Sequence, residues 1–535
     1  MRIDYIHIKT RFKNLEDFKI DIDQSSMKTV LIGLNATGKS NFLESLLIIF
    51  GTLELEHKDK SDLTFSYFIR YQCYKKDIEI DYNHKTDEYK FSISDKNSDK
   101  EKLVIEHKNR KKFFNNKRDY LPKHVFIYYS GISNRLGKYY DKYIKDYYDK
   151  IIKDDAKYEE FNEIQPIFLV QNVHGSLALL SFFLKSEEDE MTIDFLNKEL
   201  NIHDIVSTLF IIKNPDWSKI KKEDDFLWGA KGLVRRFLTD LFMFSFAPIY
   251  EKSRKAVSYN KVETNELLYL FIKDRKTFDE FISLKDFTRN QLFNALISPD
   301  LSNMLSGIKI KVKKEDVNGE LSMSEFSEGE QQLLTVLGLL KFTKDEESLI
   351  LLDEPDTHLN PQWKWKYLDF LEKVVDNPET TQIIFCTHDP LVVGSLDKKQ
   401  VVIFKKDGDK TITVNPKISP KEMSVDKILT SELFGIPSIM SKELEDKLNA
   451  KRFLQTKIMN GTISNEEKLK FNDLEAYFEN IKFYETFVDS RFEQFVKLTS
   501  EHEEFSNRDY SDEERDNLDK IAKEVLEDIL NSDKK

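Results

Sequence analysis

The chain has 535 residues, a formal net charge of −13 and a charged fraction of 33%. This length is sufficient for a large hydrophobic core and at least one further subdomain, and the acidic balance argues against a protein that coats nucleic acid. No apolar run approaches the roughly 20 residues that span a bilayer, and the first residues lack the apolar core of a signal peptide. Cys73 and Cys386 show neither metal-ligand spacing nor a disulfide pattern, so we expect a cytoplasmic protein without a membrane segment.

A glycine-rich loop lies near the start of the chain, between a predicted strand at 28–32 and a predicted helix at 41–50. Its residues 33–40 follow the P-loop pattern G-x-x-x-x-G-K-[ST], in which backbone N–H groups and the helix N-terminus bind phosphates. The lysine would reach the β- and γ-phosphates of a nucleotide and the serine hydroxyl would hold Mg²⁺. The alternative is that the P-loop pattern occurs here by chance. The predicted strand before it and the predicted helix after it argue against this alternative. The predicted ATP contacts are Asn35, Ala36, Thr37, Gly38, Lys39, Ser40 and Asn41.

The residues that follow predict β-structure. Short runs of alternating apolar and polar residues within 62–106 predict antiparallel strands, and 125–129 predicts a buried core strand. Between them, 107–118 mixes cations with Phe113 and Phe114, a composition suited to phosphate contact and base stacking. A solvated loop explains the same composition.

Residues 135–305 are predicted to form a helical insert. They are rich in Tyr, Phe, Lys and Asp and show no sustained heptad register, so we expect a compact helical subdomain instead of a long coiled-coil arm. The α/β part is expected to resume over 306–420. It begins with a strand at 307–313 that has one apolar face and one face made of lysines.

A capping box opens the next predicted helix. Ser327 and Glu330 have the S-x-x-E spacing ahead of an apolar run at 333–340, which predicts a capped core helix. The same geometry allows a second interpretation, because a helix N-terminus with a serine hydroxyl and a glycine, Gly329, can bind an anion.

Two further strands end in polar residues. Aliphatic residues 349–352 end in Asp353 and Glu354, at the carboxyl edge where open α/β sheets bind ligands. Asp353 would bind Mg²⁺, and Glu354 would polarise the water that attacks the γ-phosphate. A second aliphatic run, 382–387, ends in His388. The alternative for Asp353 and Glu354 is that they end an ordinary strand as it leaves the core. The alternative for His388 is a structural histidine without a catalytic role.

The last part of the chain differs in composition. A hairpin is predicted at 401–414, with turn residues at 407–409. Residues 421–535 predict amphipathic helices at 441–459 and 465–488, followed by an acid-rich end at 501–516. This region is either a solvated helical appendage or a docking region for a partner protein.

Four segments, in their order, resemble ABC-type ATPases: 33–40, 326–331, 349–355 and 385–388. The resemblance implies an α/β head, with a parallel core sheet that carries the P-loop and an antiparallel side sheet, divided between residues 1–134 and 306–420. It implies ATP and Mg²⁺ as ligands. It also implies catalytic roles for Glu354 and for His388, which would contact the γ-phosphate.

The same resemblance implies a pair of heads. Ser327, Gly329 and Glu330 of one copy would bind the γ-phosphate held by the other, so that ATP closes a head-to-head homodimer or a higher homo-oligomer. Residues 358–361 occupy the D-loop position at that interface, and Gln72 is the candidate for the Q-loop.

Two departures narrow the resemblance. Glu328 stands where a glycine is usual and Glu330 where a glutamine is usual, as in the chromosome-maintenance, Rad50 and OLD-like branches. Residues 425–437 resemble a segment of stand-alone bacterial ATPases of antiphage defence, with the Septu ATPase subunits as the nearest group. This implies an ATPase that scaffolds or gates an HNH-type nuclease partner, with DNA as the target. A DNA-repair ATPase of the RecF or Rad50 kind and an OLD-like chain with its own nuclease activity are the alternatives.

Overall fold

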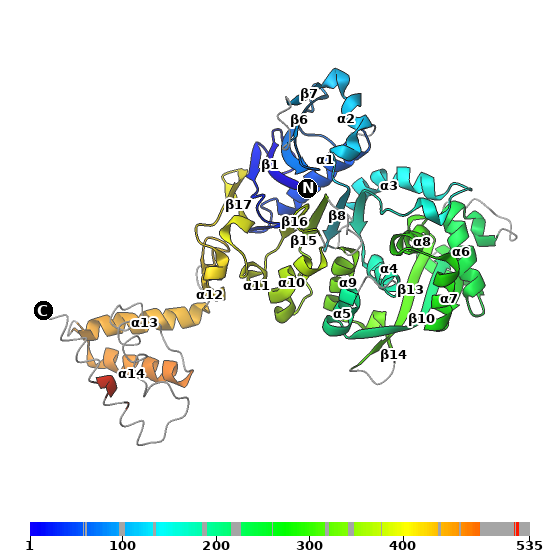
Figure 1. Ribbon diagram of the computed structural model, residues 1–535. Coiled ribbons are helices and arrows are strands. Elements are labelled where there is room, and N and C mark those ends of the chain that lie inside the picture. The colour runs from blue at the N-terminus through cyan, green and yellow to red at the C-terminus, as the bar shows by residue number, and fades with distance from the viewer. Residues whose placement is uncertain are drawn as a thin grey trace. The chain divides into compact units, whose positions relative to one another are not determined.

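The computed structural model describes residues 1–56, 58, 61–95, 102–131, 135–184, 190–215, 226–258, 261–315, 320–340, 347–375, 377–436, 440–459, 462–481, 518 and 521–523. They belong to two units, Met1–Pro437 and Ser438–Lys535. Seven of the described strands form the core sheet of the first unit, in the order β18-β17-β3-β16-β15-β8-β9 (Figure 1). Only β17 and β18 pair antiparallel among these neighbours. The bounds are β3 (Lys28–Gly33), β8 (His124–Tyr129), β9 (Ile167–Val170), β15 (Ser348–Asp353), β16 (Thr381–Cys386), β17 (Val401–Asp407) and β18 (Lys410–Val414).

The core strands bury both of their faces. Ile350 and Ile383 belong to one hydrophobic cluster, whereas their neighbours Leu349 and Ile384 belong to another on the opposite face. Strands covered on both sides need apolar residues at every position, which is why their sequences are unbroken aliphatic runs. The strands and the hairpin predicted from those runs are confirmed, and the hairpin turn contains Gly408 at a φ of 58°.

An antiparallel side sheet and helix α1 (Lys39–Glu54) cover one face of the core sheet. The side sheet has the strand order β2-β1-β4-β5-β6-β7 among the described residues, so the predicted fold class, a parallel core sheet with an antiparallel side sheet, is confirmed. Its bounds are β1 (Arg2–Ile8), β2 (Phe18–Asp21), β4 (Tyr67–Cys73), β5 (Lys76–Asn83), β6 (Glu88–Asp95) and β7 (Leu103–Glu106).

The basic segment that follows the side sheet does not present its aromatic rings to solvent. Phe113 and Phe114, on helix α2 (Lys111–Asn115), are buried against the side sheet, where Phe113 stacks on Phe91 with ring centroids 4.0 Å apart. The interpretation of these two rings as base-stacking groups is therefore wrong, because apolar burial outweighs their exposure in a loop.

The segment predicted as a helical insert contains strands as well, so that prediction is wrong in this respect. It contributes helices, but also three strands of a second antiparallel sheet, whose order is β11-β12-β10-β13-β14 among the described residues. The predicted strand at 307–313 is confirmed as β13, but it pairs with β10 of the insert and not with the core sheet. The boundary at 305 therefore cuts through this sheet. The elements are α3 (Gly137–Ile151), α4 (Asn172–Phe182), α5 (Glu190–Glu199), β10 (Ile202–Lys213), α6 (Gly232–Phe244), β11 (Ile249–Ser258), β12 (Lys261–Ile272), α7 (Arg275–Lys285), α8 (Arg289–Leu301), β13 (Leu305–Lys314) and β14 (Glu320–Ser322).

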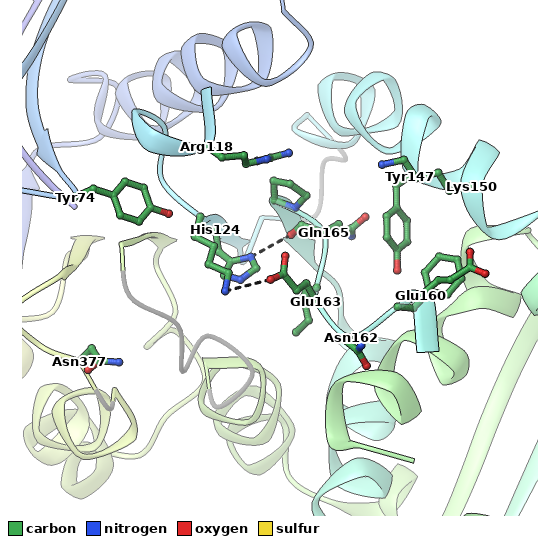
Figure 2. Close-up of a pocket in the computed structure, with 14 residues that line it drawn as sticks. Tyr74, Arg118, His124, Tyr147, Lys150, Glu160, Asn162, Glu163, Gln165 and Asn377 are labelled. Carbon is green, nitrogen blue, oxygen red and sulfur yellow. Dashed lines mark hydrogen bonds and ion pairs between the residues drawn. The ribbon is translucent and has the colours of Figure 1, made fainter. Parts of the chain in front are cut away.

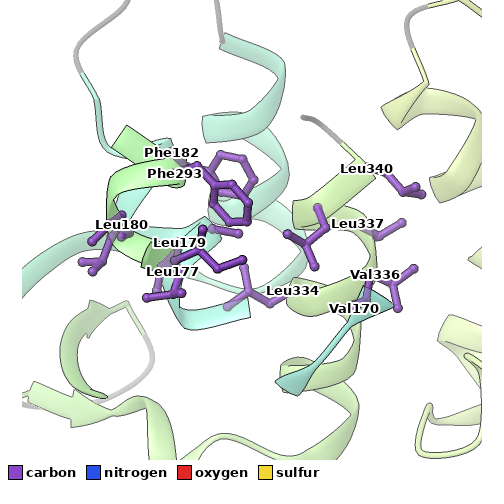
Figure 3. Close-up of a cluster of buried hydrophobic side chains, with 14 of the residues drawn as sticks. Val170, Leu177, Leu179, Leu180, Phe182, Phe293, Leu334, Val336, Leu337 and Leu340 are labelled. Atoms are coloured by element: carbon purple, nitrogen blue, oxygen red, sulfur yellow. The ribbon is translucent and has the colours of Figure 1, made fainter. Parts of the chain in front are cut away.

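Helices α4 and α9 (Glu328–Leu340) pack together around a cluster of buried hydrophobic side chains (Figure 3), and small residues allow their close approach. A Cβ on Gly175 of α4 would lie 2.3 Å from Oγ1 of Thr335 on α9, and a Cβ on Gly338 would lie 3.2 Å from Phe182. Leu334 and Leu337 of α9 belong to the same buried cluster as the leucines of α4. The insert therefore supports the helix that carries the predicted capping box.

The remaining α-helices among the described residues of the first unit are α10 (Pro361–Val374), α11 (Pro390–Val393) and α12 (Val425–Thr430), and Ile428 of α12 is buried. The unit ends at Pro437, later than the boundary expected at 420. The described 3₁₀ turns are His107–Asn109, Lys117–Asp119, Tyr158–Glu160, Phe226–Gly229, Met323–Glu325, Lys398–Gln400 and Pro420–Glu422.

The second unit contains helices α13 (Lys442–Met459) and α14 (Asn465–Asn480), which confirm the two predicted helices up to Asn480. They pack through contacts such as Lys447 over the ring of Tyr477. The acid-rich end at 501–516 lies outside the described residues. None of the helices in the described ranges is long and apolar enough to cross a membrane.

Candidate functional site

Three of the predicted segments meet at the carboxyl edge of the core sheet. Strand β16 lies between β3 and β15, and Cys386 at its end pairs with Leu31 on one side and with Asp353 on the other. Because all three strands run parallel, the P-loop, the Asp353-Glu354 pair and His388 follow them at the same edge. This edge is where a ligand of an open α/β sheet is expected.

The P-loop has the backbone that its glycines allow. Gly33 and Gly38 have φ values of 148° and 106°, and a Cβ on Gly33 would lie 2.4 Å from the carbonyl oxygen of Phe404. Asn35 and Ala36 form the exposed tip of the loop, whereas Thr37 is buried. Helix α1 begins at Lys39, and no side chain caps its first N–H groups. Such a terminus can bind phosphate oxygens.

Lys39 is held beneath the loop. Its Nζ donates to the carbonyl oxygen of Gly33 at 2.8 Å and lies 3.0 Å from Nε2 of His388. Burial lowers the pKa of Lys39, and the nearby Cys386, Glu354 and Asp353 oppose that shift. A phosphate at this place would replace the carbonyl and histidine contacts with stronger, charge-assisted hydrogen bonds.

Glu354 and His388 form a pair beside Lys39. His388 Nε2 lies 3.2 Å from Oε1 of Glu354, and this hydrogen bond lowers the pKa of the Glu354 carboxyl group. A neutral imidazole nitrogen either donates or accepts, so Nε2 serves Glu354 or Lys39, but not both at once. Glu354 has a φ of 51°, a conformation that costs a non-glycine residue about 1–3 kcal/mol and that recurs at functional sites.

Asp353 has the properties of a cation ligand. Its Oδ1 is buried and has no hydrogen-bond partner among the described residues. Burial raises the pKa of Asp353, and a hydrogen bond from Ser40 partly offsets that shift. No group of three or more His, Cys, Asp or Glu residues that could hold a metal occurs in the described part of the chain. Mg²⁺ is usually held by one or two protein oxygens together with substrate phosphates and water, which Asp353 and Ser40 fit.

Several residues beside this edge were not predicted from the sequence. Asn14 accepts a hydrogen bond from Asn41 at 2.6 Å and donates to the carbonyl oxygen of Ala36 at 3.1 Å. Arg135 donates to Glu44 at 3.0 Å and also contacts the side chain of Asn41. Both connect helix α1 to segments that are distant in sequence. The only signal for Arg135 is its place shortly after β8, the strand that pairs with β15.

The predicted capping box is confirmed. The backbone N–H of Glu330 donates to Ser327 Oγ at 3.2 Å, and the backbone N–H of Ser327 donates to the Glu330 carboxylate at 2.9 Å. Lys314 also contacts Glu330, whose pKa is lowered by these hydrogen bonds although burial opposes the shift. Among the described residues, no contact joins Ser327, Gly329 or Glu330 to the P-loop of the same chain.

The capping box lies beside the segment predicted as the D-loop. A Cβ on Gly329 would lie 2.8 Å from the carbonyl oxygen of His358, and His358 Nδ1 lies 2.9 Å from a carboxylate oxygen of Glu328. Asp356 is buried and accepts a hydrogen bond from Thr387 at 2.7 Å, and burial raises the pKa of Asp356 to about 6. Because a Cβ on Gly329 would collide with His358, packing requires a glycine at this position whether or not an anion binds there. Gln72, the Q-loop candidate, lies in the side sheet opposite Arg2 and Asp77.

A family model described as an AAA ATPase domain matches residues 1–393. The chain belongs to this family. The match includes the P-loop, the Asp353-Glu354 pair and His388. Membership in this ATPase family implies nucleotide binding and ATPase activity.

Relatives of this AAA ATPase domain protein match over short regions. The Septu protein PtuA of Bacillus mycoides (strain KBAB4) is 28% identical over 173 residues, 30% of this chain and 24% of the relative. The Retron Ec83 probable ATPase of Escherichia coli is 26% identical, over 24% of this chain and 26% of the relative. The Retron Vc95 probable ATPase of Vibrio cholerae serotype O1 biovar El Tor is 26% identical, over 36% of both chains. The chain thus aligns with about a quarter to a third of each relative's length.

Among solved structures, an SMC head bound to the C-winged helix domain of ScpA is similar at 12% identity, over 78% of this chain and 98% of that chain, with a TM-score of 0.31. An SMC head domain from Thermotoga maritima is similar at 12% identity, over 78% of this chain and 100% of that chain, with a TM-score of 0.28.

The AAA ATPase domain also contains a cavity of about 900 Å³ at the opposite, amino-terminal edge of the core sheet (Figure 2). Lys123, His124, Glu163 and Gln165 line it, and most of its polar groups are already engaged. His124 Nδ1 lies 3.4 Å from the carbonyl oxygen of Gln165, and Lys123 lies 3.5 Å from Glu163. Size alone therefore does not identify the nucleotide site of this protein.

Proposed function

We propose that this chain binds ATP with Mg²⁺ at the carboxyl edge of its core sheet and hydrolyses it. One observation carries the proposal: at the end of the P-loop strand, Nε2 of His388 lies 3.0 Å from Nζ of Lys39 and 3.2 Å from Oε1 of Glu354, so that His388 joins groups from three separate segments. A phosphate-binding cation, a carboxylate base and an imidazole are the groups that phosphoryl transfer to water uses.

Each proposed residue has a place in this reaction. Residues 35–41 bind the phosphates through the exposed loop tip and the first turn of α1, and Lys39 leaves Gly33 to bind the β- and γ-phosphates. Ser40 and Asp353 hold Mg²⁺, which neutralises charge on the phosphate oxygens. Glu354, kept ionised by its low pKa, accepts the proton of the attacking water. His388 holds the Glu354 carboxylate and contacts the γ-phosphate.

The active form is proposed to be a head-to-head homodimer or a larger homo-oligomer. Ser327 is exposed at the start of α9, where Glu330 is partly buried and Gly329 is buried, and none of the three contacts the P-loop of its own chain within the described ranges. An anion-binding helix start can then serve the ATP of a second copy. Gly329 packs on His358, so a ligand at the helix start would act directly on the D-loop.

The biological output is proposed to lie in a partner protein. The similarity to the Septu protein PtuA and to two retron ATPases supports a role in antiphage defence. We propose that ATP controls an HNH-type nuclease that acts on DNA, and that residues 421–535 dock this partner. Two exposed apolar side chains of the second unit, Phe453 and Leu469, offer it a contact surface.

The variant Glu354→Gln tests the ATPase proposal. It removes the base and keeps the size of the side chain, so turnover should fall by a factor of about 10² to 10⁴ while ATP stays bound. ATP retention on a desalting column and mass photometry should show a longer-lived closed pair. Glu280→Gln, an exposed carboxylate of α7 whose ion-pair partner Lys276 is also exposed, is the matched control and should behave as the wild type. Unchanged turnover in Glu354→Gln would refute the role of this residue.

The nuclease proposal needs a separate test. The chain is purified with and without the product of its neighbouring gene and incubated with plasmid DNA and Mg²⁺. Cleavage should require the partner and should depend on ATP. Cleavage by the chain alone that disappears in a variant of this chain would favour an OLD-like nuclease, whereas the absence of a nuclease neighbour would favour a repair ATPase.

A further inference from the structure

The second antiparallel sheet has one buried and one open face. On β10 and β13, Phe210, Ile212, Ile310 and Val312 are buried against the helices of the insert. The alternate side chains of β13, Lys309, Lys311 and Lys313, are exposed. Successive side chains of a strand point to opposite faces, so these lysines line the outer face of the sheet.

Strand register places one aromatic ring in the row of Lys309, at one end of this lysine line, and a second ring in the adjoining row of Gly307. Phe271 of β12 lies opposite Leu209 of β10, which lies opposite Lys309 of β13. In the next row, Tyr269 lies opposite Ile211, which lies opposite Gly307. Each row therefore runs from a ring, across an aliphatic residue, to the lysine-bearing strand.

The aromatic end of the face is exposed to solvent. Phe271 is 36% exposed, and the backbone N–H of Phe246 donates to the carbonyl oxygen of Phe271, which brings Phe246, itself 63% exposed, beside it. Ile249 on the edge strand β11 lies opposite Tyr269 and is 58% exposed. Large apolar side chains at this density on a surface indicate an interaction site.

The middle of the face is open as well. A Cβ on Gly307 would meet no atom within 4 Å. Lys311 pairs with Glu320 at 3.0 Å, whereas Lys309 and Lys313 form no ion pair with any residue in the described ranges. The face therefore combines accessible rings with cations that are available to a ligand.

We infer that the outer face of the β11-β12-β10-β13-β14 sheet binds single-stranded DNA, with its phosphates along the β13 lysines and its bases on the rings of β12. The choice of DNA rests on the proposed function, but the surface itself does not depend on ATP hydrolysis. Alternate residues of a strand are about 6.7 Å apart, so the three lysines form a regular line suited to an extended phosphate backbone. Strands β13 and β12 are about 9.6 Å apart, which leaves room for a nucleotide between phosphate and base.

The same features argue against a duplex and against an apolar protein partner. Bases stacked inside a duplex cannot reach rings on a sheet, whereas unstacked bases lie flat on aromatic side chains. A purely apolar partner would leave the line of lysines without counter-charges, since free cations are depleted from the centres of protein interfaces.

Salt dependence tests the lysine line. A fluorescent 30-nucleotide oligothymidine is titrated with the full chain, without nucleotide, at several salt concentrations. Each phosphate that a lysine neutralises contributes about 0.7 to the slope of log K against log salt, so Lys309→Ala with Lys313→Ala should reduce the slope by about 1.4. The control pair, Lys90→Ala with Lys276→Ala, changes the net charge equally on other surfaces and should leave the slope unchanged. An equal effect of both pairs would overturn the inference.

Gly307 has open space around it, so side chains of opposite charge can be placed there and should change the affinity for the oligonucleotide in opposite directions. Gly307→Lys should tighten binding of the oligonucleotide and Gly307→Glu should weaken it, because either side chain fits without displacing a neighbour. Phe271→Leu keeps an apolar contact but removes the ring, and should weaken binding between about five- and 150-fold. Effects of the same sign for both Gly307 variants, or a preference for duplex DNA or for RNA of equal length, would contradict the assignment.

This experiment and the ATPase test can fail independently. Lys39→Ala should bind the oligonucleotide as the wild type does, because the sheet face shares no residue with the P-loop. Wild-type ATP turnover in Gly307→Glu, together with weakened oligonucleotide binding, would support both proposals. Full oligonucleotide binding by a wild-type protein that shows no ATP turnover would support the surface and refute the proposed ATP chemistry.

Discussion

The candidate ATP site has two halves that are built differently. Lys39, Glu354 and His388 follow neighbouring strands of one parallel sheet, so the backbone hydrogen bonds of the sheet bring them together. Ser327 and Glu330 instead lie at the start of helix α9, which packs on α4 of the insert. In the chain, α9 follows β13 and β14, two strands of the second antiparallel sheet. The first half is positioned by local strand pairing, and the second by packing with residues distant in sequence.

This difference predicts which changes separate nucleotide binding from turnover. Changes at the strand ends should act on binding and chemistry directly. Changes at α9 or at its support should leave the P-loop intact and act through the orientation of the capping box. The ATPase would then depend on the insert even though the insert supplies no predicted catalytic group.

The largest separation is expected between Lys39→Ala and Ser327→Arg. Lys39→Ala removes the proposed phosphate-binding cation and should abolish both ATP binding and turnover. Ser327→Arg places a long cation at the exposed start of α9, and should abolish turnover and pair formation while ATP binding to the single chain persists. Isothermal titration calorimetry and mass photometry measure the two quantities. Loss of ATP binding in Ser327→Arg would show that the two halves are not separable.

A pH effect is expected next, at the contact between the halves. Burial raises the pKa of Asp356 to about 6, above its usual value near 4, so the folded protein retains a proton that the unfolded chain releases. The contribution of Asp356 to the free energy of unfolding is greatest below pH 4, where this carboxyl group is protonated in both states. It decreases by about 3 kcal/mol as the pH rises to about 6. Asp356→Asn keeps an acceptor for Thr387 but does not titrate. The difference between wild type and variant in urea unfolding should therefore vary over pH 4–6 and be constant above it.

The support of α9 gives a smaller expected effect. Gly175→Val places atoms where Thr335 Oγ1 would lie 2.3 Å away, so α4 and α9 must separate, at a cost of about 1–3 kcal/mol. We expect reduced turnover with nearly unchanged ATP affinity, and a lower melting temperature. Gly307→Val, where a Cβ meets nothing within 4 Å, is the control and should not alter turnover. Equal loss of ATP affinity and turnover in Gly175→Val would contradict the role of α4.

The smallest effect is expected within the half of the site that follows the core strands, namely Lys39, Glu354 and His388; we call it the strand-borne half. The hydrogen bond from His388 lowers the pKa of Glu354, so its removal should raise that pKa. The acid limb of the kcat/KM profile for ATP should therefore move to higher pH in His388→Ala, in addition to any loss of rate. Asn360→Ala, which removes the cap of α10 without touching Glu354, should leave the limb in place. An unmoved limb in His388→Ala would mean that His388 does not tune this carboxyl group.

The sequence predicted the strand-borne half well for a physical reason. Strands buried on both faces require aliphatic residues throughout, and their polar ends are then visible as breaks in the pattern. Prediction was weaker where burial depends on remote partners. The insert was predicted to be helical, whereas its strand β10 pairs with β13, which lies about a hundred residues later in the chain. Phe113 is buried by the side sheet, and the sequence around Phe113 does not indicate this contact.

Residues such as Arg135 and Asn14 belong to the same class. Each contacts α1 from a distant segment, and the local sequence gives no signal for either residue beyond the place of Arg135 shortly after β8.

The sequence by itself determined the P-loop, the two strands that end in Asp353-Glu354 and His388, and the capping box of α9, because each depends on residues within about one turn or strand. Only the tertiary structure decided that β13 completes a second sheet with the insert, that α4 supports α9, and that an open face of lysines and rings results. These features depend on pairings between residues far apart in the chain, and their cost in chain entropy is offset only by contacts formed in the folded protein.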